Sequence, residues 1–278
     1  MAYKAEISRV QPSCFLFLID QSGSMDGVFG ADQQKTKSVA VADAINRILR
    51  DLVIKCSKGE GIRDYYEVSV IGYGSNVGLV FGGPLSGRSF VPIGEVAANP
   101  ARVEERTKKV DDGAGGLVDQ RTKFPVWFDP KAENGTPMCQ ALDQSRQLLT
   151  DWILAHPNSY PPTVINITDG ESTDGDPQAA AQSLTSLATS DGNVLLLNCH
   201  ISGSSAAPIV FSASEAGLPD DAAKRLFRMS SVLPPKLWET AQMEMPNLES
   251  NARGFAFNAD LRELIRFLDI GTRPSNLR

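Results

Sequence analysis

A chain of 278 residues in which 42% are hydrophobic and 22% are charged can bury a sizeable core, and its length suits one large domain or two small ones. The formal net charge of −6 excludes the basic footprint expected of a protein that binds nucleic acid or an anionic membrane. We therefore expect a globular protein with neither kind of partner.

The N-terminal residues lack the basic flank, apolar core and small-residue cleavage site of a signal peptide, and the apolar runs are far shorter than a bilayer span. The sequence therefore predicts a cytoplasmic protein. The cysteines are widely spaced without a Cys-x-x-Cys pair, so we expect reduced thiols in or near the core at Cys14, Cys56, Cys139 and Cys199. A zinc site also needs histidine, and we interpret both histidines, His156 and His200, as structural.

The first predicted element is a strand over residues 15–19, an unbroken apolar run of the kind that is buried on both faces of a sheet. Asp20 follows at once, with Ser22 and Ser24 at alternate positions after it. Carboxylate and hydroxyl oxygens suit a hard divalent cation such as Mg²⁺, and Gly23 lets the loop bend tightly. The pattern favours a metal-binding loop over an ordinary polar turn.

A calcium loop of the EF-hand type is an alternative, because acids and serines alternate over residues 20–26. The EF-hand needs a glycine at its sixth position and a bidentate glutamate at its twelfth, where this chain has Met25 and Ala31. We therefore set the EF-hand aside.

Apolar residues at helical spacing predict a helix over residues 32–55. Residues 65–73 and 77–81 are rich in β-branched and aromatic side chains around a turn signal, which predicts a hairpin with its second strand at the sheet edge. Residues 82–133 contain many Gly and Pro breaks, so we expect a functional loop or short elements there. Within that segment, the charge run 102–112 favours a solvated face over a binding patch.

Two further loops carry oxygen ligands. Thr136, within Asn134-Gly135-Thr136-Pro137-Met138, precedes a predicted helix over residues 137–155, and Asp169 follows a predicted strand over residues 164–168. Taken alone, Thr136 fits a helix start and Asp169 fits an Asp-Gly turn. In a parallel sheet, however, both loops would leave from the same edge as Asp20, where ligands bind.

The remaining elements alternate between helix and strand, which predicts a mostly parallel sheet with helices on both faces. They are a helix over 176–187 with Asp176 as its N-cap, a strand over 194–200, helices over 220–229 and 234–243, a strand over 255–257, and a helix over 261–268 with Asn258 as a cap. The apolar residues of the long segment 202–250 are expected to pack in the core rather than receive a partner: Leu233, Leu237, Trp238, Met243 and Met245.

The three candidate loops together resemble the von Willebrand factor A (vWA) domains. Their metal-ion-dependent adhesion site (MIDAS) carries Asp-x-Ser-x-Ser after the first strand, a threonine from a second loop and an aspartate from a third. The matching positions in this chain are Asp20, Ser22, Ser24, Thr136 and Asp169.

The resemblance implies a Rossmann-like three-layer sandwich in the α/β class, with a mostly parallel central sheet and one antiparallel edge strand. It covers residues 13–270, which we interpret as a single domain with inserted segments near 82–133 and 202–250. Residues 1–12 would then be an N-terminal extension and residues 271–278 a C-terminal tail.

By the same resemblance, Ser22 and Ser24 would bind the ion directly. Asp20 and Asp169 would bind it directly or through water. Thr136 would enter or leave the coordination shell as the conformation changes. Mg²⁺ is the expected ion, with Mn²⁺ and Ca²⁺ as alternatives. Because hydroxyls carry no charge, two carboxylates only just balance the ion, which keeps its affinity for an Asp or Glu of a partner protein.

The sequence thus favours a non-enzymatic, metal-dependent protein-interaction module that acts as a scaffold or regulator in a bacterial-type cytoplasmic complex. Gly135-Thr136-Pro137-Met138 and Leu226-Phe227-Arg228-Met229-Ser230-Ser231 are similar to stand-alone bacterial vWA proteins linked to tellurium resistance, a stress response. We expect substitutions at Asp20, or at Ser22 and Ser24 together, to leave the fold intact, because these groups would lie on surface loops.

Two alternatives remain open. A Mg²⁺-dependent phosphatase or phosphotransferase would use Asp20 as its nucleophile, but a phosphoaspartyl mechanism would prefer a second acid where Ser22 stands, and no phosphate-binding glycine loop follows a strand. The other alternative is an adaptor subunit for an AAA+ ATPase. Near the same loops, further acids could attract a second cation or a basic segment, although solvated acids and helix caps are the favoured interpretation: Asp26, Glu171, Asp174 and Asp176.

Overall fold

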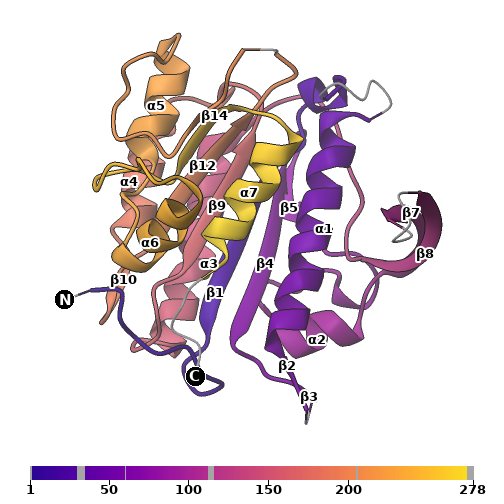
Figure 1. Cartoon of the computed structure of the whole chain (residues 1–278). Coiled ribbons are helices and arrows are strands. Elements are labelled where there is room, and N and C mark those ends of the chain that lie inside the picture. Colours follow the sequence, from indigo (N-terminus) through magenta and orange to yellow (C-terminus); the bar gives the residue numbers. More distant parts are fainter. Residues whose placement is uncertain (1, 30–34, 60, 112–115, 205, 274–278) are drawn as a thin grey trace.

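A central sheet organises the molecule, and the computed structural model describes it over residues 2–29, 35–59, 61–111, 116–204 and 206–273. Within these residues the strand order is β13-β14-β12-β9-β1-β4-β5, with β6 beside β4 (Figure 1). The inner strands run parallel to one another: β1 Ser13–Asp20, β4 Tyr66–Tyr73, β9 Thr163–Thr168, β12 Leu195–Ile201 and β14 Phe255–Ala259. The predicted mostly parallel sheet is confirmed.

Short antiparallel strands complete the sheet. β5, Val77–Leu79, pairs with β4 at one edge, as the hairpin signal predicts. β6, Val91–Pro92, pairs with the other end of β4, and β13, Ile209–Val210, pairs with β14 at the opposite edge.

Helices cover both faces because side chains alternate along each strand. Phe15 and Phe17 of β1 face one core, with α1 Lys37–Cys56, α2 Ile93–Ala98, α6 Pro235–Glu244 and α7 Leu261–Gly271. Leu16 and Leu18 face the other core, with α3 Met138–Ala155, α4 Gln178–Thr185 and α5 Asp221–Met229. The result is the expected α/β three-layer sandwich (Figure 1). Among the described residues, no helix combines the length and apolar character needed to cross a bilayer.

Smaller elements connect these layers. Single 3₁₀ turns form at Gly23–Asp26 and Gly83–Leu85. Two short hairpins pair β2 Ser57–Lys58 with β3 Gly61–Ile62, and β10 Ala188–Thr189 with β11 Gly192–Asn193.

The segment 82–133 contains a ribbon that the sequence analysis did not predict: β7, Arg102–Asp111, paired with β8, Leu117–Val126. Opposite charges face each other across the two strands, for example Glu105 opposite Lys123 and Lys109 opposite Asp119. The ribbon rests on α1, where the Asn46 side chain bonds the backbone of Trp127 and Phe128 at 2.8 and 3.1 Å. The charge run 102–112 is therefore one strand of a ribbon, apart from residue 112, which lies outside the described residues.

Several predicted boundaries are wrong. The first helix starts at Lys37 because Thr36 accepts the Val39 amide as its N-cap; residues 32–34 of the predicted helix lie outside the described residues. The helix predicted over 176–187 forms only over Gln178–Thr185 and has Pro177 at its N-cap position. Asn258 lies in β14 with a φ of 55°, and Asp260 caps α7 instead.

The apolar residues of the segment 202–250 divide between core and surface. Leu233 and Leu237 are buried, and Trp238 and Met245 pack against the same core. Met243 is 83% exposed, so the prediction that it packs in the core is wrong.

Candidate metal centre

The carboxyl edge of the sheet brings the first and third candidate loops together. Asp20 is the last residue of β1, and β1 pairs in register with β9, with Ile19 opposite Ile167. Asp169 follows directly after β9. Because the two parallel strands end at the same level, their loops begin side by side.

Asp20 lies at the base of the site and is fully buried. One of its carboxylate oxygens accepts the Ser22 backbone amide at 2.8 Å, and the other accepts the Thr168 hydroxyl at 2.6 Å. Burial raises the pKa of Asp20, the hydrogen bonds from Ser22 and Thr168 oppose this shift, and the nearby charge of Asp169 adds to it. The expectation that these groups lie on surface loops is wrong for Asp20 and for Ser22, which is only 4% exposed, and is confirmed for Ser24, which is exposed.

A continuous chain of hydrogen bonds joins the two serines to the third loop. The hydroxyls of Ser22 and Ser24 are 2.9 Å apart, and the Ser24 hydroxyl donates to Asp169 Oδ1 at 2.7 Å. Four of the five residues predicted from the sequence therefore lie within one short network: Asp20, Ser22, Ser24 and Asp169.

The sequence analysis missed two residues of this network: Thr168, which bonds Asp20, and Lys37, which bonds Asp169. The Lys37 ammonium lies 2.7 Å from Asp169 Oδ2, and the Asp169 side chain is fully buried while that of Lys37 is 17% exposed. Lys37 is the first residue of α1, where the helix dipole disfavours a positive charge. A lysine at that position is a signal that a carboxylate lies opposite, although the sequence does not say which one.

Thr136 lies in the adjacent second loop. The Glu133 amide donates to the Gln21 carbonyl at 2.6 Å, which ties this loop to the first one. The Thr136 amide donates to the Thr173 hydroxyl at 2.8 Å and its carbonyl accepts the Thr173 amide at 2.9 Å, which ties it to the third loop. The Thr136 hydroxyl bonds no described residue, so its oxygen is not engaged as a helix cap.

The surrounding acids serve the loops and helices. Asp174 accepts the Cys139 and Gln140 amides at 3.0 and 2.9 Å, at the start of α3, and the Ser172 hydroxyl at 2.7 Å. Burial alone would raise the pKa of Asp174, but these hydrogen bonds outweigh it and lower the pKa. Asp176 accepts the Gln178 amide at 3.0 Å at the start of α4. Asp174 fits the cap interpretation, whereas Asp176 lies one residue before the N-cap position of α4, which Pro177 occupies.

A metal such as zinc would need a different set of donors. No group of three or more His, Cys, Asp or Glu side chains in that part of the chain is placed to hold a metal ion. His156 contacts Trp152 with the rings tilted by 36° and the centroids 4.7 Å apart, and His200 stacks on Phe257 at 4.6 Å. All four cysteines are free thiols.

The donor set at the sheet edge fits a hard cation. It offers two carboxylates and two hydroxyls within hydrogen-bonding distance of one another, with the Thr136 hydroxyl in the neighbouring loop. Oxygen donors of this kind, completed by water, are what Mg²⁺ takes in proteins. Lys37 adds one positive charge to the two carboxylates.

Comparison with known proteins agrees on the fold. A von Willebrand factor type A protein from Catenulispora acidiphila is 16% identical with a TM-score of 0.51, covering 95% of this chain and 43% of that chain. The ArnB paralog VWA2 from Sulfolobus acidocaldarius is 13% identical with a TM-score of 0.35, covering 69% of this chain and 35% of that one.

The vWF domain of the type V pili tip protein Mfa5 from Porphyromonas gingivalis is 15% identical with a TM-score of 0.33, covering 59% of this chain and 39% of that one. This chain thus spans less than half the length of these solved chains. No protein-family model matches it, and neither does any curated protein. At 16% identity, the likeness to the Catenulispora acidiphila protein shows the fold alone.

Proposed function

We propose that this protein is a metal-dependent protein-interaction module that binds an acidic side chain of a partner through a divalent cation. The observation that carries the proposal is the hydrogen-bonded series from Ser22 through Ser24 to Asp169, next to the buried carboxylate of Asp20. It joins loops that are 145 residues apart in the sequence, and it consists of the oxygen donors that Mg²⁺ prefers.

Each residue has a distinct role in this proposal. Ser22, Ser24 and Thr136 supply neutral oxygens, while Asp20 and Asp169 supply the negative charge. A divalent ion held by these residues would supply Lewis acidity toward a carboxylate of the partner. With Lys37, the side chains carry a net charge of about −1, so a site loaded with a divalent ion is positive and attracts an anion.

The residue types around Asp20 favour binding over catalysis. A phosphoaspartyl mechanism would prefer a second acid two residues after Asp20, where Ser22 stands. The partner class we propose is a protein in a bacterial-type cytoplasmic complex, with an AAA+ ATPase among the partners to test.

Calorimetry tests the proposal. We expect Mg²⁺ uptake by the wild-type chain in the presence of a short peptide rich in glutamate, with no uptake by the Ser22→Ala/Ser24→Ala variant. Asp26→Asn is the matched control, because Asp26 is exposed and lies in the same loop outside the donor set. An absence of divalent uptake by the wild type would contradict the proposal. Mg²⁺-dependent hydrolysis of phosphoesters that Asp20→Ala abolishes would favour the enzyme instead.

A further inference from the structure

A groove runs between α1 and α7 on the helical face opposite α3. It consists of two hollows of about 400 and 460 Å³, and both are lined by Arg47 of α1 and Ile265 of α7. Because they share these side chains, we describe them as one feature, the α1–α7 groove. Phe124 of the ribbon lines one end, and Glu244 of α6 lines the other.

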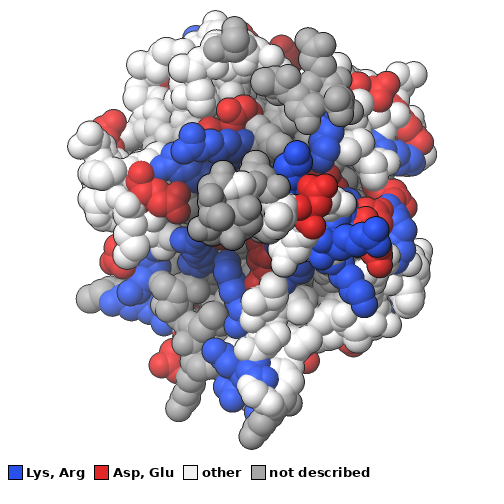
Figure 2. All heavy atoms as spheres, turned by 45° about the vertical axis from the view of Figure 1, so that its right-hand side comes forward, with Lys and Arg blue, Asp and Glu red and all other residues white. Residues whose placement is uncertain are grey.

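The groove is positively charged in an acidic protein. Eight of its lining side chains are Lys or Arg and four are Asp or Glu, whereas the whole chain has a formal net charge of −6. Figure 2 shows Lys and Arg side chains gathered on the face that carries α1 and the ribbon. The groove therefore carries a local excess of positive charge, although the whole chain is negatively charged. This excess attracts acidic groups to this face of the molecule.

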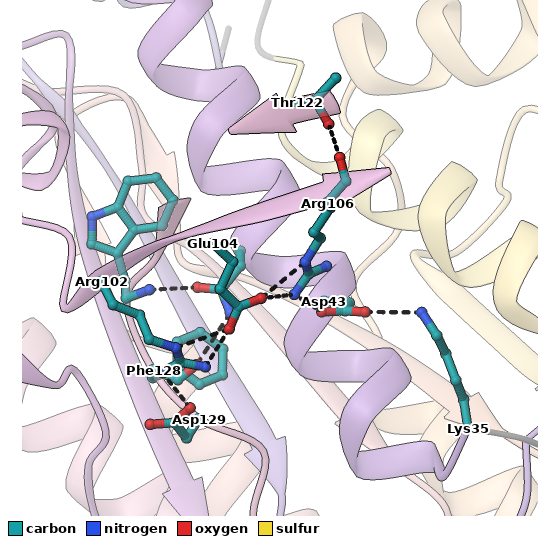
Figure 3. A network of polar contacts seen from close by, with 10 residues as sticks. Lys35, Asp43, Arg102, Glu104, Arg106, Thr122, Phe128 and Asp129 are labelled. Atoms are coloured by element: carbon teal, nitrogen blue, oxygen red, sulfur yellow. Dashed lines mark hydrogen bonds and ion pairs between the residues drawn. The ribbon is translucent and has the colours of Figure 1, made fainter. Parts of the chain in front are cut away.

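The acids in the groove are already engaged. Asp43 lies 3.1 Å from Lys35 and 2.9 Å from Arg106, and Arg106 also lies 2.8 Å from Glu104 (Figure 3). The Arg106 guanidinium covers the Phe124 ring at 3.7 Å, which holds it in place. These contacts neutralise the charge of Asp43. The remaining positive charge of the groove is available to acidic groups of a ligand.

Arg47 and Arg262 carry much of that remaining charge. The Arg47 side chain is 51% exposed, and its ion pair with Asp51 is long at 3.7 Å, while Asp51 also pairs with Arg50 at 2.9 Å. Arg262 is exposed and forms no ion pair with any residue that the structure describes. An incoming carboxylate can therefore pair with either guanidinium without breaking a short internal bond.

Aliphatic side chains lie among the charged residues that line the groove. Ile265 is partly buried, Leu261 is 38% exposed and Ile54 is 62% exposed. A ligand that buries this surface needs apolar groups between its charges. A polypeptide offers both, whereas a nucleic-acid backbone offers charge without aliphatic side chains and is repelled by the chain as a whole.

We propose that the α1–α7 groove binds an acidic segment of a partner polypeptide, with Asp or Glu side chains on Arg47 and Arg262 and an apolar side chain on Leu261 and Ile265. The groove uses none of the donors at the sheet edge, so this binding needs no metal ion. It is a second docking surface, separate from the proposed metal-dependent one.

Fluorescence anisotropy of a labelled peptide in which Glu and Leu alternate tests the proposal on the full chain. The Arg47→Glu/Arg262→Glu variant should bind this peptide at least about tenfold more weakly than the wild type. The control, Arg9→Glu/Arg121→Glu, makes the same change of charge at exposed residues outside the groove and should stay within about twofold. Replacing every Glu of the peptide by Gln should also abolish binding.

A charge-swapped peptide, with Lys in place of Glu, should bind the Arg47→Glu/Arg262→Glu variant more tightly than the wild type. This gain of binding cannot come from misfolding. Equal binding of the Glu and Gln peptides, an unaffected double variant, or tighter binding of single-stranded DNA at the same salt concentration would overturn the proposal. Loss of peptide binding in Asp20→Ala would do so as well, whereas loss of Mg²⁺ uptake alone concerns only the sheet-edge site.

Discussion

The sheet-edge site and the α1–α7 groove both concentrate charged groups, but they hold them in different ways. At the sheet edge, Asp20 and the Asp169 side chain are fully buried and are held by hydrogen bonds of 2.6–2.8 Å. In the groove, long side chains such as Arg47 and Lys35 are about half exposed. A buried polar group is stable only with its own hydrogen-bond partner. Exposed charges act through their combined electrostatic field, which salt screens. Changes at the edge should therefore be large and specific, whereas loss of a single ion pair at the groove should change stability little and in a way that depends on salt.

The largest effect is expected for Asp20→Ala. The change removes a proposed ion ligand, leaves the Ser22 amide without its acceptor and leaves the Thr168 hydroxyl only the Gly170 carbonyl at 3.1 Å, so we expect Mg²⁺ uptake to be lost and the free energy of unfolding to fall by about 1–3 kcal/mol. Calorimetry and urea denaturation measure the two effects. Asp26→Ala, at an exposed acid in the same loop, should change neither. A fully stable Asp20→Ala variant would show that burial at this position is unimportant.

Lys37→Met tests how the positive charge of the lysine beside the sheet-edge site affects Mg²⁺ binding. The ammonium pairs with Asp169 and opposes a second positive charge, so its removal should tighten Mg²⁺ binding by about tenfold, or about 1.4 kcal/mol. Calorimetry measures the change. Lys35→Met is the matched control, because Lys35 pairs with Asp43 instead and should leave Mg²⁺ affinity unchanged. Weaker Mg²⁺ binding by Lys37→Met would instead show that the lysine stabilises the metal-binding arrangement of the site.

Asp174→Ala should cost about 1 kcal/mol of unfolding free energy, because it removes the acceptor for the first amides of α3. The pKa of Asp174 is lowered in the folded chain, so its contribution is complete above the ordinary value of 3.8 and disappears as the pH falls through the lower folded value. Urea denaturation at neutral and acidic pH measures this dependence. Glu171→Ala changes an exposed neighbouring acid and should show no such difference.

The smallest effect is expected in the ion-pair network at the groove. Glu104→Gln removes a partner of Arg106 and Arg102, and exposed pairs of this kind contribute about 0–1 kcal/mol. Hydrogen bonding from Arg106 lowers the pKa of Glu104, so any loss of stability should be seen at neutral pH and fade at high salt. Glu105→Gln, at a side chain 70% exposed and 3.9 Å from Arg121, is the control. A loss that persists at high salt would mean that the pair is not screened.

The sheet and its main helices were predictable because their signals are local. The apolar runs of β1 and β9 and the helical spacing of α3 are continuous in the sequence, and the end of α3 at Ala155 is the predicted one. The β7–β8 ribbon was missed because it has no apolar periodicity: its two strands pair with each other, and the chain next to β8 is held on α1 by Asn46. These contacts link residues far apart in the sequence.

The candidate site was predictable where each ligand follows a recognisable strand or precedes a recognisable helix, as with Asp20, Thr136 and Asp169. Lys37 was not, because its partner is 132 residues away and nothing near it in the sequence names that partner. Thr168 was hidden because a threonine at the end of an apolar strand is an ordinary strand residue.

The position of Asp174 has a mechanical consequence. Its carboxylate holds the first turn of α3, and the same loop bonds Thr136 in both directions through Thr173. If α3 slid along its axis, it would therefore carry the second and third loops with it as one rigid piece. Deuterium exchange at the Cys139 and Gln140 amides would report such a displacement before any distant part of the chain responded.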